Sequence, residues 1–248
     1  MMANKKRCTA IMLAAGSGSR MQSKVAKQFM LLEGRPLICH ALEAVERSGI
    51  IDDCILVTGE KDIAYVRKEI VEKYHFTKVI HIVAGGAERY LSVGNALQVL
   101  ADETAAANED GYVFIHDGAR PFLTEQILED TYRAVQQYHA CVAAVPSKDT
   151  VKIADKDGFV AVTPERKLVW SIQTPQVFTR SLIVDAYRRL REGLAELDKK
   201  GVMVTDDASV VELFTEQRVR LVEASYTNIK ITTPEDIKTA EVFLKKDF

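Results

Sequence analysis

The sequence has little of the residues and patterns that mark special classes of protein. It contains 4 cysteines, 6 prolines and 1 tryptophan in 248 residues. Its longest apolar runs fall far short of the ~20 residues needed to span a bilayer, so no transmembrane helix is expected. It also lacks an excess of charge, since 33 Lys+Arg against 35 Asp+Glu give 33 − 35 = −2. These shortages exclude a disordered or collagen-like chain and a generally polycationic nucleic-acid binder.

The few cysteines point to a reducing compartment. They are Cys8, Cys39, Cys54 and Cys141, which are widely separated and form no C-x-x-C pair. Cys54 and Cys141 lie in apolar, strand-like contexts. We expect reduced, structural thiols and no zinc site. The basic residues 5–7 superficially resemble the start of a signal peptide, but the apolar run that follows breaks at Gly16. The sequence therefore predicts a cytoplasmic protein without a membrane partner.

Short β-branched runs alternate with amphipathic helical patterns through most of the chain. This alternation is typical of βαβ units and predicts an α/β fold with a mainly parallel sheet flanked by helices. The predicted strands are Thr9–Leu13, Cys54–Thr58, Val79–Val83, Val113–His116, Ala140–Val145 and Val219–Glu223. The predicted helices are Leu37–Ser48, Ile63–Tyr74, Ser92–Leu100, Glu125–Tyr138 after the N-cap Thr124, Ser181–Leu190, Asp206–Phe214 and a last helix from Pro234. We interpret residues 1–248 as a single domain.

The alternation is interrupted after Pro146. Thr150–Ile153 and Phe159–Thr163 are two β-like runs joined by a segment containing Asp157-Gly158, a strong hairpin signal. An exposed two-stranded hairpin is marginal by itself. We therefore predict a projecting β-hairpin arm over residues 146–170 that packs on a second subunit, making a homodimer.

The end of the first predicted strand carries a candidate phosphate-binding turn. Leu13-Ala14-Ala15-Gly16-Ser17-Gly18-Ser19-Arg20 is rich in small residues, so backbone N–H groups could approach phosphates. Met21 stands where the dinucleotide fingerprint needs Gly and the P-loop needs Gly before Lys, so neither motif is present. A tight turn without a ligand would explain two glycines equally well. Arg20 and Lys27 favour a nucleotide, because nucleotidyl transfer requires cations that neutralise charge in the transition state.

These residues carry a resemblance to a known family. Leu13–Met21 with Lys27–Phe29 resembles the opening signature of the sugar nucleotidyltransferases, and later segments narrow the resemblance to the 2-C-methyl-D-erythritol 4-phosphate cytidylyltransferase family. Those segments, in the family's order, are 85–93, 116–122, 149–152, 163–170, 173–176, 205–209 and 228–232. The resemblance extends from about Thr9 to Leu244. It implies a Rossmann-like fold of the nucleotide-diphospho-sugar transferase type.

The resemblance also implies a reaction. The family joins CTP to 2-C-methyl-D-erythritol 4-phosphate, releasing pyrophosphate, with Mg²⁺ bound mainly through the CTP phosphates and Asp117 as the candidate protein ligand. The nucleophile is a phosphate oxygen, which is largely anionic near neutral pH because its second pKa is about 6. No general base is required, and His116 is interpreted as a structural residue.

Residue roles are carried over on the matching positions. The implied catalytic residues are Arg20, Lys27, Arg166 and Lys230. The implied CTP-binding residues are Ala14, Ala15, Gly16, Gly18, Gly86, Ala87, Ser92, Asp117 and Gly118. The implied acceptor-binding residues are Asp117, Arg120, Thr150, Arg166, Thr174 and Lys230. In the family, the residues matching Thr150 and Arg166 reach into the neighbouring subunit's site.

Two local features and three alternatives remain at this point. The family usually has Pro before the catalytic Lys, whereas Ala26 stands here, which predicts a looser loop and slower turnover or weaker binding. Asp206 and Asp207 are interpreted as helix-capping residues rather than metal ligands. The alternatives are a cytidylyltransferase for another polyol phosphate such as ribitol 5-phosphate, a non-catalytic nucleotide-binding regulator, and a dehydrogenase. The missing glycine fingerprint argues against the last.

Overall fold

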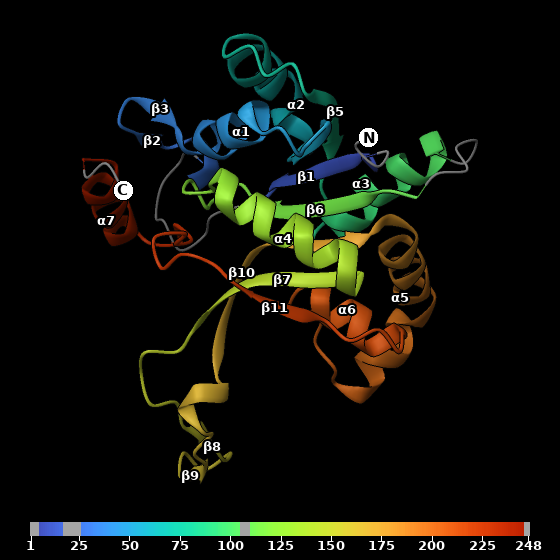
Figure 1. Ribbon diagram of the computed structural model, residues 1–248, viewed down its shortest axis with the longest axis vertical. Coiled ribbons are helices and arrows are strands. Elements are labelled where there is room, and N and C mark those ends of the chain that lie inside the picture. The colour runs from blue at the N-terminus through green and yellow to red at the C-terminus, as the bar shows by residue number, and fades with distance from the viewer. Residues whose placement is uncertain (1–4, 17–25, 105–109, 246–248) are drawn as a thin grey trace.

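A single seven-stranded sheet forms the centre of the molecule, with helices on both faces (Figure 1). The computed structural model describes residues 5–16, 26–104 and 110–245. The strand order is β11-β7-β10-β6-β1-β4-β5. The strands are β1 Cys8–Ala14, β4 Asp53–Thr58, β5 Val79–Ala84, β6 Tyr112–Asp117, β7 Ala140–Pro146, β10 Trp170–Thr179 and β11 Arg220–Glu223. The predicted α/β class with a mainly parallel sheet is confirmed.

The helices lie close to their predicted positions. They are α1 Leu37–Arg47, α2 Ile63–Tyr65 continued by a π-helical segment Val66–Glu72, α3 Arg89–Thr104, α4 Glu125–Tyr138, α5 Arg180–Lys200, α6 Asp207–Phe214 and α7 Pro234–Lys245. Two of them are longer than predicted, since α3 begins three residues before Ser92 and α5 continues ten residues beyond Leu190. The Thr124 side chain caps α4 by accepting a hydrogen bond from the Ile127 amide at 3.3 Å.

Strand β1 shows why the chain forms two packed layers. Its residues alternate in direction, so Ala10 and Met12 join the hydrophobic cluster under α1 and α4, while Ile11 joins the cluster under α3, α5 and α6. Both faces of the strand are therefore buried, which explains a nearly continuous apolar run. Because β1 pairs in parallel with both β4 and β6, its carboxyl end opens beside theirs.

Strand β10 was not predicted. It runs antiparallel between β6 and β7, in the interior of the sheet, and its ladder with β7 is irregular between Ile172 and Gln176. Pro175 has no amide hydrogen to donate to a ladder, and the polar residues Gln173 and Thr174 interrupt the apolar pattern. This segment therefore has no alternating or continuous apolar pattern from which a strand could be predicted.

The predicted hairpin arm projects from the sheet, with shorter strands than the sequence suggested (Figure 1). Its strands are β8 Ile153–Ala154 and β9 Val160–Val162, which pair antiparallel. Gly158 adopts a positive φ of 88°, as the Asp-Gly signal predicted. The strands are short because the hairpin lies away from the core, where few contacts reward a longer ladder.

The four cysteines are all free and buried. Burial raises the pKa of the Cys8 and Cys39 thiols to about 12, and it raises the pKa values of Cys54 and Cys141 as well. Since the thiolate is the reactive form, these residues act as small core side chains, as predicted. Among the helices of the described residues, none is long and apolar enough to cross a bilayer.

A glycine after β6 allows two strand ends to approach each other closely. The Gly118 amide donates to the Leu13 carbonyl oxygen at 2.8 Å, and a Cβ at this position would lie 2.9 Å from the same oxygen. We expect Gly118→Ala to lower the free energy of unfolding by about 1–3 kcal/mol, because backbone must move. Urea unfolding of the purified variants measures this.

A second glycine supplies the control for that prediction. A Cβ at Gly94, within α3, would lie 3.7 Å from the Tyr187 ring, an ordinary contact. Gly94→Ala should therefore leave stability unchanged or raise it by about 0.5–1 kcal/mol, the usual gain for alanine in a helix interior. Equal urea midpoints for the two variants would contradict the role given to Gly118.

Candidate active site

A cavity of about 330 Å³ lies at the carboxyl ends of β1 and β6, where ligands bind in open parallel sheets. It brings together segments that are far apart in the sequence. The predicted site residues that line it are Ala14, Ala15, Gly16, Lys27, Gly86, Ala87, Ser92, Asp117 and Lys230. Gly18 and Arg20 lie outside the described residues. Gly118 follows Asp117 directly and is buried, with its amide bonded to β1.

The segment around Lys27 is tied to the end of β1. Gln28 is buried and donates through Nε2 to the Ala14 carbonyl oxygen at 2.6 Å. This bond holds the short 3₁₀ helix Lys27–Phe29 against the end of β1, and Lys27 lines the cavity. Ala26 has a φ of −59°, the value that proline enforces. The backbone angle that the family's proline would set is therefore present with alanine.

The turn between β5 and α3 packs directly on the end of β1. A Cβ at Gly85 would lie 2.3 Å from the Ala15 Cβ and 2.9 Å from the Ser92 hydroxyl oxygen, which leaves no room for a side chain. The Gly86 amide donates to the Ser92 hydroxyl at 3.0 Å. Ser92 therefore fixes the conformation of the turn from within α3, and the small residues form one wall of the cavity.

Asp117 is the carboxylate around which the positive charges of the cavity gather. It is buried, and its Oδ2 lies 2.6 Å from the Lys230 Nζ while its Oδ1 lies 3.4 Å from the Arg89 Nε. Burial by itself would raise the pKa of Asp117, but the positive charges of Arg89, Lys230 and Arg120 outweigh it and hold the pKa below its ordinary value. Asp117 is therefore ionised, and two cations face it.

His116 is a buried structural residue, as predicted. Its Nε2 lies 3.1 Å from the Arg120 carbonyl oxygen, which can only accept, so Nε2 carries the hydrogen. Its Nδ1 then accepts from the Thr174 hydroxyl at 3.0 Å, and that hydroxyl accepts from the Asp117 amide at 3.1 Å. Burial lowers the pKa of His116 to about 4, so the ring is neutral near pH 7.

This chain of hydrogen bonds engages Thr174, for which the resemblance implies acceptor binding. Its side chain is buried, and its hydroxyl hydrogen is used by His116. A bond from Thr174 to an acceptor phosphate would have to replace that contact. In this structure Thr174 supports the Asp117 backbone, and it does not line the cavity.

The remaining acceptor residues lie outside the cavity of their own chain. Arg120 donates through Nη1 to the Asn228 carbonyl oxygen at 2.7 Å, and burial lowers its pKa. Thr150 and Arg166 are exposed on the arm and do not line the cavity. Among the described residues, the structure thus brings most of the implied CTP-binding positions together and leaves the two arm positions apart from them.

Sequence reasoning missed two residues that shape the site. Arg89 lines the cavity, although the family resemblance implied no role for its side chain. Asp207, interpreted as a capping residue, is fully buried and paired with Arg89, whereas its neighbour Asp206 forms the predicted cap in a capping box with Ser209. A doublet of acidic residues at a helix start was the available signal, because one cap needs only one carboxylate.

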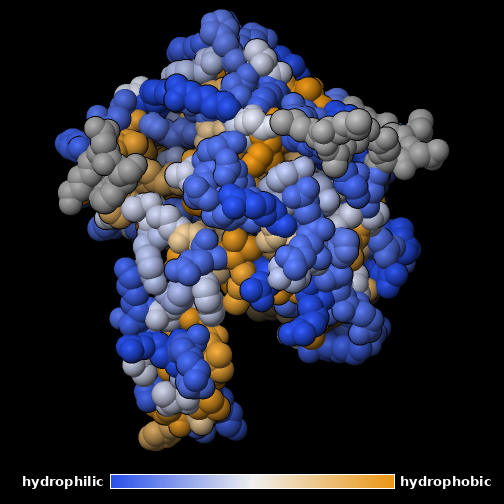
Figure 2. Space-filling model, in the orientation of Figure 1, coloured by the Kyte–Doolittle hydropathy of each residue, from blue (hydrophilic) through white to orange (hydrophobic). Residues whose placement is uncertain are grey.

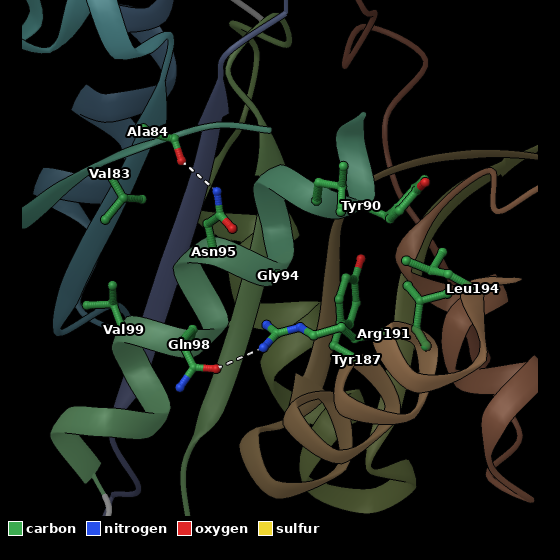
Figure 3. A pocket seen from close by; sticks show the side chains of 12 residues that line it. Val83, Ala84, Tyr90, Gly94, Asn95, Gln98, Val99, Tyr187, Arg191 and Leu194 are labelled. Atoms are coloured by element: carbon green, nitrogen blue, oxygen red, sulfur yellow. Dashed lines mark hydrogen bonds between the residues drawn. The ribbon is translucent and has the colours of Figure 1, made fainter. Parts of the chain in front are cut away.

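A second cavity, of about 450 Å³, lies between α3 and α5 beside β5 (Figure 3). None of the predicted site residues that the structure describes lines it. Its polar contacts are internal, since Asn95 donates to the Ala84 carbonyl oxygen at 2.9 Å and Arg191 donates to Gln98 at 3.4 Å. The first cavity is therefore the candidate active site.

Comparison with known proteins decides the family. The model of the 2-C-methyl-D-erythritol 4-phosphate cytidylyltransferase family matches residues 8–246, nearly the whole chain. The chain belongs to this family. A protein of that name from Lachnospira eligens is 48% identical over 96% of this chain and 99% of its own length.

Solved structures of the cytidylyltransferase family share the fold. The crystal structure of 4-diphosphocytidyl-2C-methyl-D-erythritol synthase from Anaerococcus prevotii matches with a TM-score of 0.82 and 36% identity, covering 98% of both chains. The cytidylyltransferase from Francisella tularensis matches with a TM-score of 0.76 and 28% identity, over 95% of this chain and 99% of that one. The expected family, fold and enzyme class are confirmed, and the dehydrogenase alternative is set aside.

Proposed function

We propose that this nucleotidyltransferase joins CTP and 2-C-methyl-D-erythritol 4-phosphate to form 4-diphosphocytidyl-2-C-methyl-D-erythritol and pyrophosphate. The observation that carries the proposal is the family match over residues 8–246, together with a cavity lined by Asp117, Lys27, Lys230 and other described positions of the implied CTP site. The acceptor phosphate attacks the α-phosphate of CTP in line, the new P–O bond forms, and pyrophosphate leaves.

The chemistry requires charge neutralisation more than proton transfer. Both reactants are anions, and the acceptor oxygen is already largely deprotonated near neutral pH. Lys27 and Lys230 line the cavity and supply positive charge. At an effective dielectric of about 20, a cation ~4 Å from a phosphate oxygen interacts by roughly 4 kcal/mol before desolvation is counted. The part of this attraction that is stronger in the transition state than in the bound nucleotide raises the rate, tenfold for every ~1.4 kcal/mol.

The neutral His116 agrees with this mechanism. Its two ring nitrogens are occupied by Arg120 and Thr174, and burial holds its pKa at about 4. It therefore neither takes a proton from the acceptor nor presents a charge to the phosphates. Its contribution is to hold Thr174, and through it the backbone of Asp117.

The cavity suits a Mg²⁺ ion brought in with the triphosphate. Mg²⁺ prefers oxygen ligands and is usually bound through substrate phosphates with one or two carboxylates. Asp117 is an ionised carboxylate that lines the cavity, so the chain offers the donor that such a complex needs. The ion would neutralise charge on the triphosphate and favour departure of pyrophosphate.

The arm supports a homodimer in which each subunit completes its partner's site. Its exposed side chains include Phe159 and Leu168, which are 74% and 71% exposed, and Figure 2 shows apolar surface along the arm. A monomer would leave this surface in water, which favours burial against a second copy. Thr150 and Arg166 would then supply the hydroxyl and guanidinium for the acceptor phosphate.

Because Arg166 is assigned to acceptor binding and not to CTP binding, we can predict the effect of Arg166→Ala. We expect the KM for the acceptor to rise at least tenfold, because a guanidinium that binds phosphate is lost. CTP binding should change less than threefold, since Arg166 lies outside the CTP cavity. Steady-state kinetics with either substrate varied, together with calorimetric CTP binding, check this. Lys167→Ala, which removes a neighbouring exposed cation of the arm, is the control.

The proposed function is tested by pyrophosphate release with CTP and Mg²⁺. Three samples are compared: 2-C-methyl-D-erythritol 4-phosphate, ribitol 5-phosphate and no acceptor. Turnover only with the erythritol phosphate supports the proposal. Turnover only with ribitol 5-phosphate would replace the substrate, and CTP binding without turnover would favour a non-catalytic regulator.

We place the enzyme in the cytoplasm, where reduced thiols such as its four free cysteines persist.

A further inference from the structure

An arginine beside the cavity bridges two carboxylates from different parts of the chain. Arg89, the first residue of α3, donates through Nη1 and Nη2 to the two carboxylate oxygens of Asp207 at 2.8 and 2.7 Å. Its Nε lies 3.4 Å from Asp117. Asp207 is 118 positions away from Arg89 in the sequence, at the start of α6. Arg89 thus lines the cavity while being held from outside it.

Asp207 is held as firmly as it holds Arg89. It is fully buried, and the same carboxylate oxygen that receives Nη1 also accepts from the Tyr187 hydroxyl at 2.6 Å. Its backbone amide donates to the Gln176 side chain at 2.9 Å, which fixes the start of α6 on β10. The carboxylate therefore has three donors, and its position is set by three different elements.

Stability alone does not account for such a pair. Burying two charges costs desolvation energy that the attraction between them often only offsets, so a buried ion pair is a weak source of stability. The geometry suggests orientation instead. A guanidinium is planar, so when two of its nitrogens bind one carboxylate, the direction of the N–H on its third nitrogen is fixed. In Arg89 that third nitrogen is Nε, and its N–H faces Asp117.

We propose that Asp207 is a positioning residue of the nucleotide site. By holding the Arg89 guanidinium, it orients the Asp117 carboxylate and fixes the turn 85–88 that forms the adjoining cavity wall. The inference rests on the proposed function for its kinetic expression, since Asp117 is placed in the CTP site. It assigns roles to two residues that lie outside the set implied by the family resemblance.

The chain offers a matched control one residue away. Asp206 is also a carboxylate at the start of α6, but it accepts from the Ser209 amide and from Gln176 rather than from Arg89. Asparagine is as good an N-cap as aspartate, so Asp206→Asn keeps the helix start. A second control is Arg191→Gln, which removes an arginine from the second cavity, between α3 and α5, which Tyr187 also lines (Figure 3).

The test compares Asp207→Asn with these controls in steady-state kinetics and in calorimetric titration with CTP. Asp207→Asn should lower kcat/KM for CTP at least tenfold and weaken CTP binding at least threefold, with the acceptor KM changed less than twofold. Asp206→Asn and Arg191→Gln should stay within threefold of wild type in every constant. A folded Asp207→Asn with wild-type constants, or an equal loss in Asp206→Asn, would overturn the inference.

A double variant separates positioning through Arg89 from independent effects of the two residues. Arg89→Lys keeps a positive charge beside the buried Asp207 but cannot bind both carboxylates. If Asp207 acts through Arg89, combining the two substitutions should cost less than twofold beyond the more severe single variant, whereas multiplied losses would contradict the inference. Because CTP binding is measured directly, absence of turnover in the wild type would refute the proposed function while the binding data still decide the role of Asp207.

Discussion

Lys27→Ala should lower kcat by about 10²–10³-fold while leaving CTP affinity within about threefold of wild type. Lys27 lines the cavity at the end of β1, where Gln28 fixes its segment to the Ala14 carbonyl oxygen. We assign it to the charge that develops on the α-phosphate during transfer. Such a group contributes more to the transition state than to the bound nucleotide, so its loss appears mainly in kcat.

The measurement is steady-state pyrophosphate release combined with calorimetric CTP binding. Lys61→Ala is the matched control, because Lys61 is an exposed lysine that does not line the cavity. It should retain wild-type kcat. A Lys27→Ala enzyme that keeps kcat but binds CTP a hundredfold more weakly would show that Lys27 serves ground-state binding, contrary to the assignment.

Asp117→Asn should have the second large effect, a fall in kcat/KM of about 10²–10⁴-fold. Asparagine keeps the size of the side chain but removes the charge that faces Lys230 and Arg89. Lys230 would lose its ion-pair partner, and the cavity would lose the carboxylate offered to a Mg²⁺ ion. The effect therefore combines altered charge with lost orientation.

The control for this substitution is a carboxylate at the amino end of a strand, whereas Asp117 lies at the carboxyl end of β6. Asp53 begins β4, is buried like Asp117, and is paired with Arg7 at 2.6 Å. Asp53→Asn removes an ion pair between a buried carboxylate and the exposed Arg7, away from the cavity, so it should lower stability while kcat/KM stays within about threefold. Equal kinetic losses in the two variants would mean that both act through stability.

Stability against pH offers a further reading of Asp117→Asn. The folded protein holds the pKa of Asp117 below its ordinary value. Ionised Asp117 therefore contributes stability above the unfolded pKa of about 3.9, and this contribution is lost as the pH falls from there toward the lower folded pKa. In thermal unfolding, Asp117→Asn should flatten the acid side of the stability curve relative to wild type.

The sequence was informative where one local pattern determined the outcome. Strands such as β1 and β4 are buried on both faces, and their apolar runs reveal them directly. The candidate CTP positions are those that the family resemblance implies, and its motifs are short segments next to strand ends. Helix caps at Thr124 and Asp206 were predicted because capping depends on nearby residues.

The rest depended on pairs that no local pattern can reveal. Arg89 and Asp207 are 118 positions apart, so their pairing exists only once the sheet has brought α3 and α6 together. The direction of the Thr174 hydroxyl bond depends on which nitrogen of His116 carries hydrogen, and the Arg120 carbonyl decides that. Strand β10 was hidden because its neighbours β6 and β7, rather than its own apolar pattern, define it.

The place of β10 in the sheet also sets the order in which the chain can fold. Strands β1, β4, β5 and β6 are contained in the first 117 residues and can pair as soon as those residues are available. Until residues 170–179 arrive, β6 keeps an unpaired edge, and such edges invite pairing with other chains. Asp117 lies at the end of β6, and its ion-pair partner Lys230 is synthesised after β10. The enzyme's reactive centre is therefore assembled late in synthesis, on a sheet that is already half built.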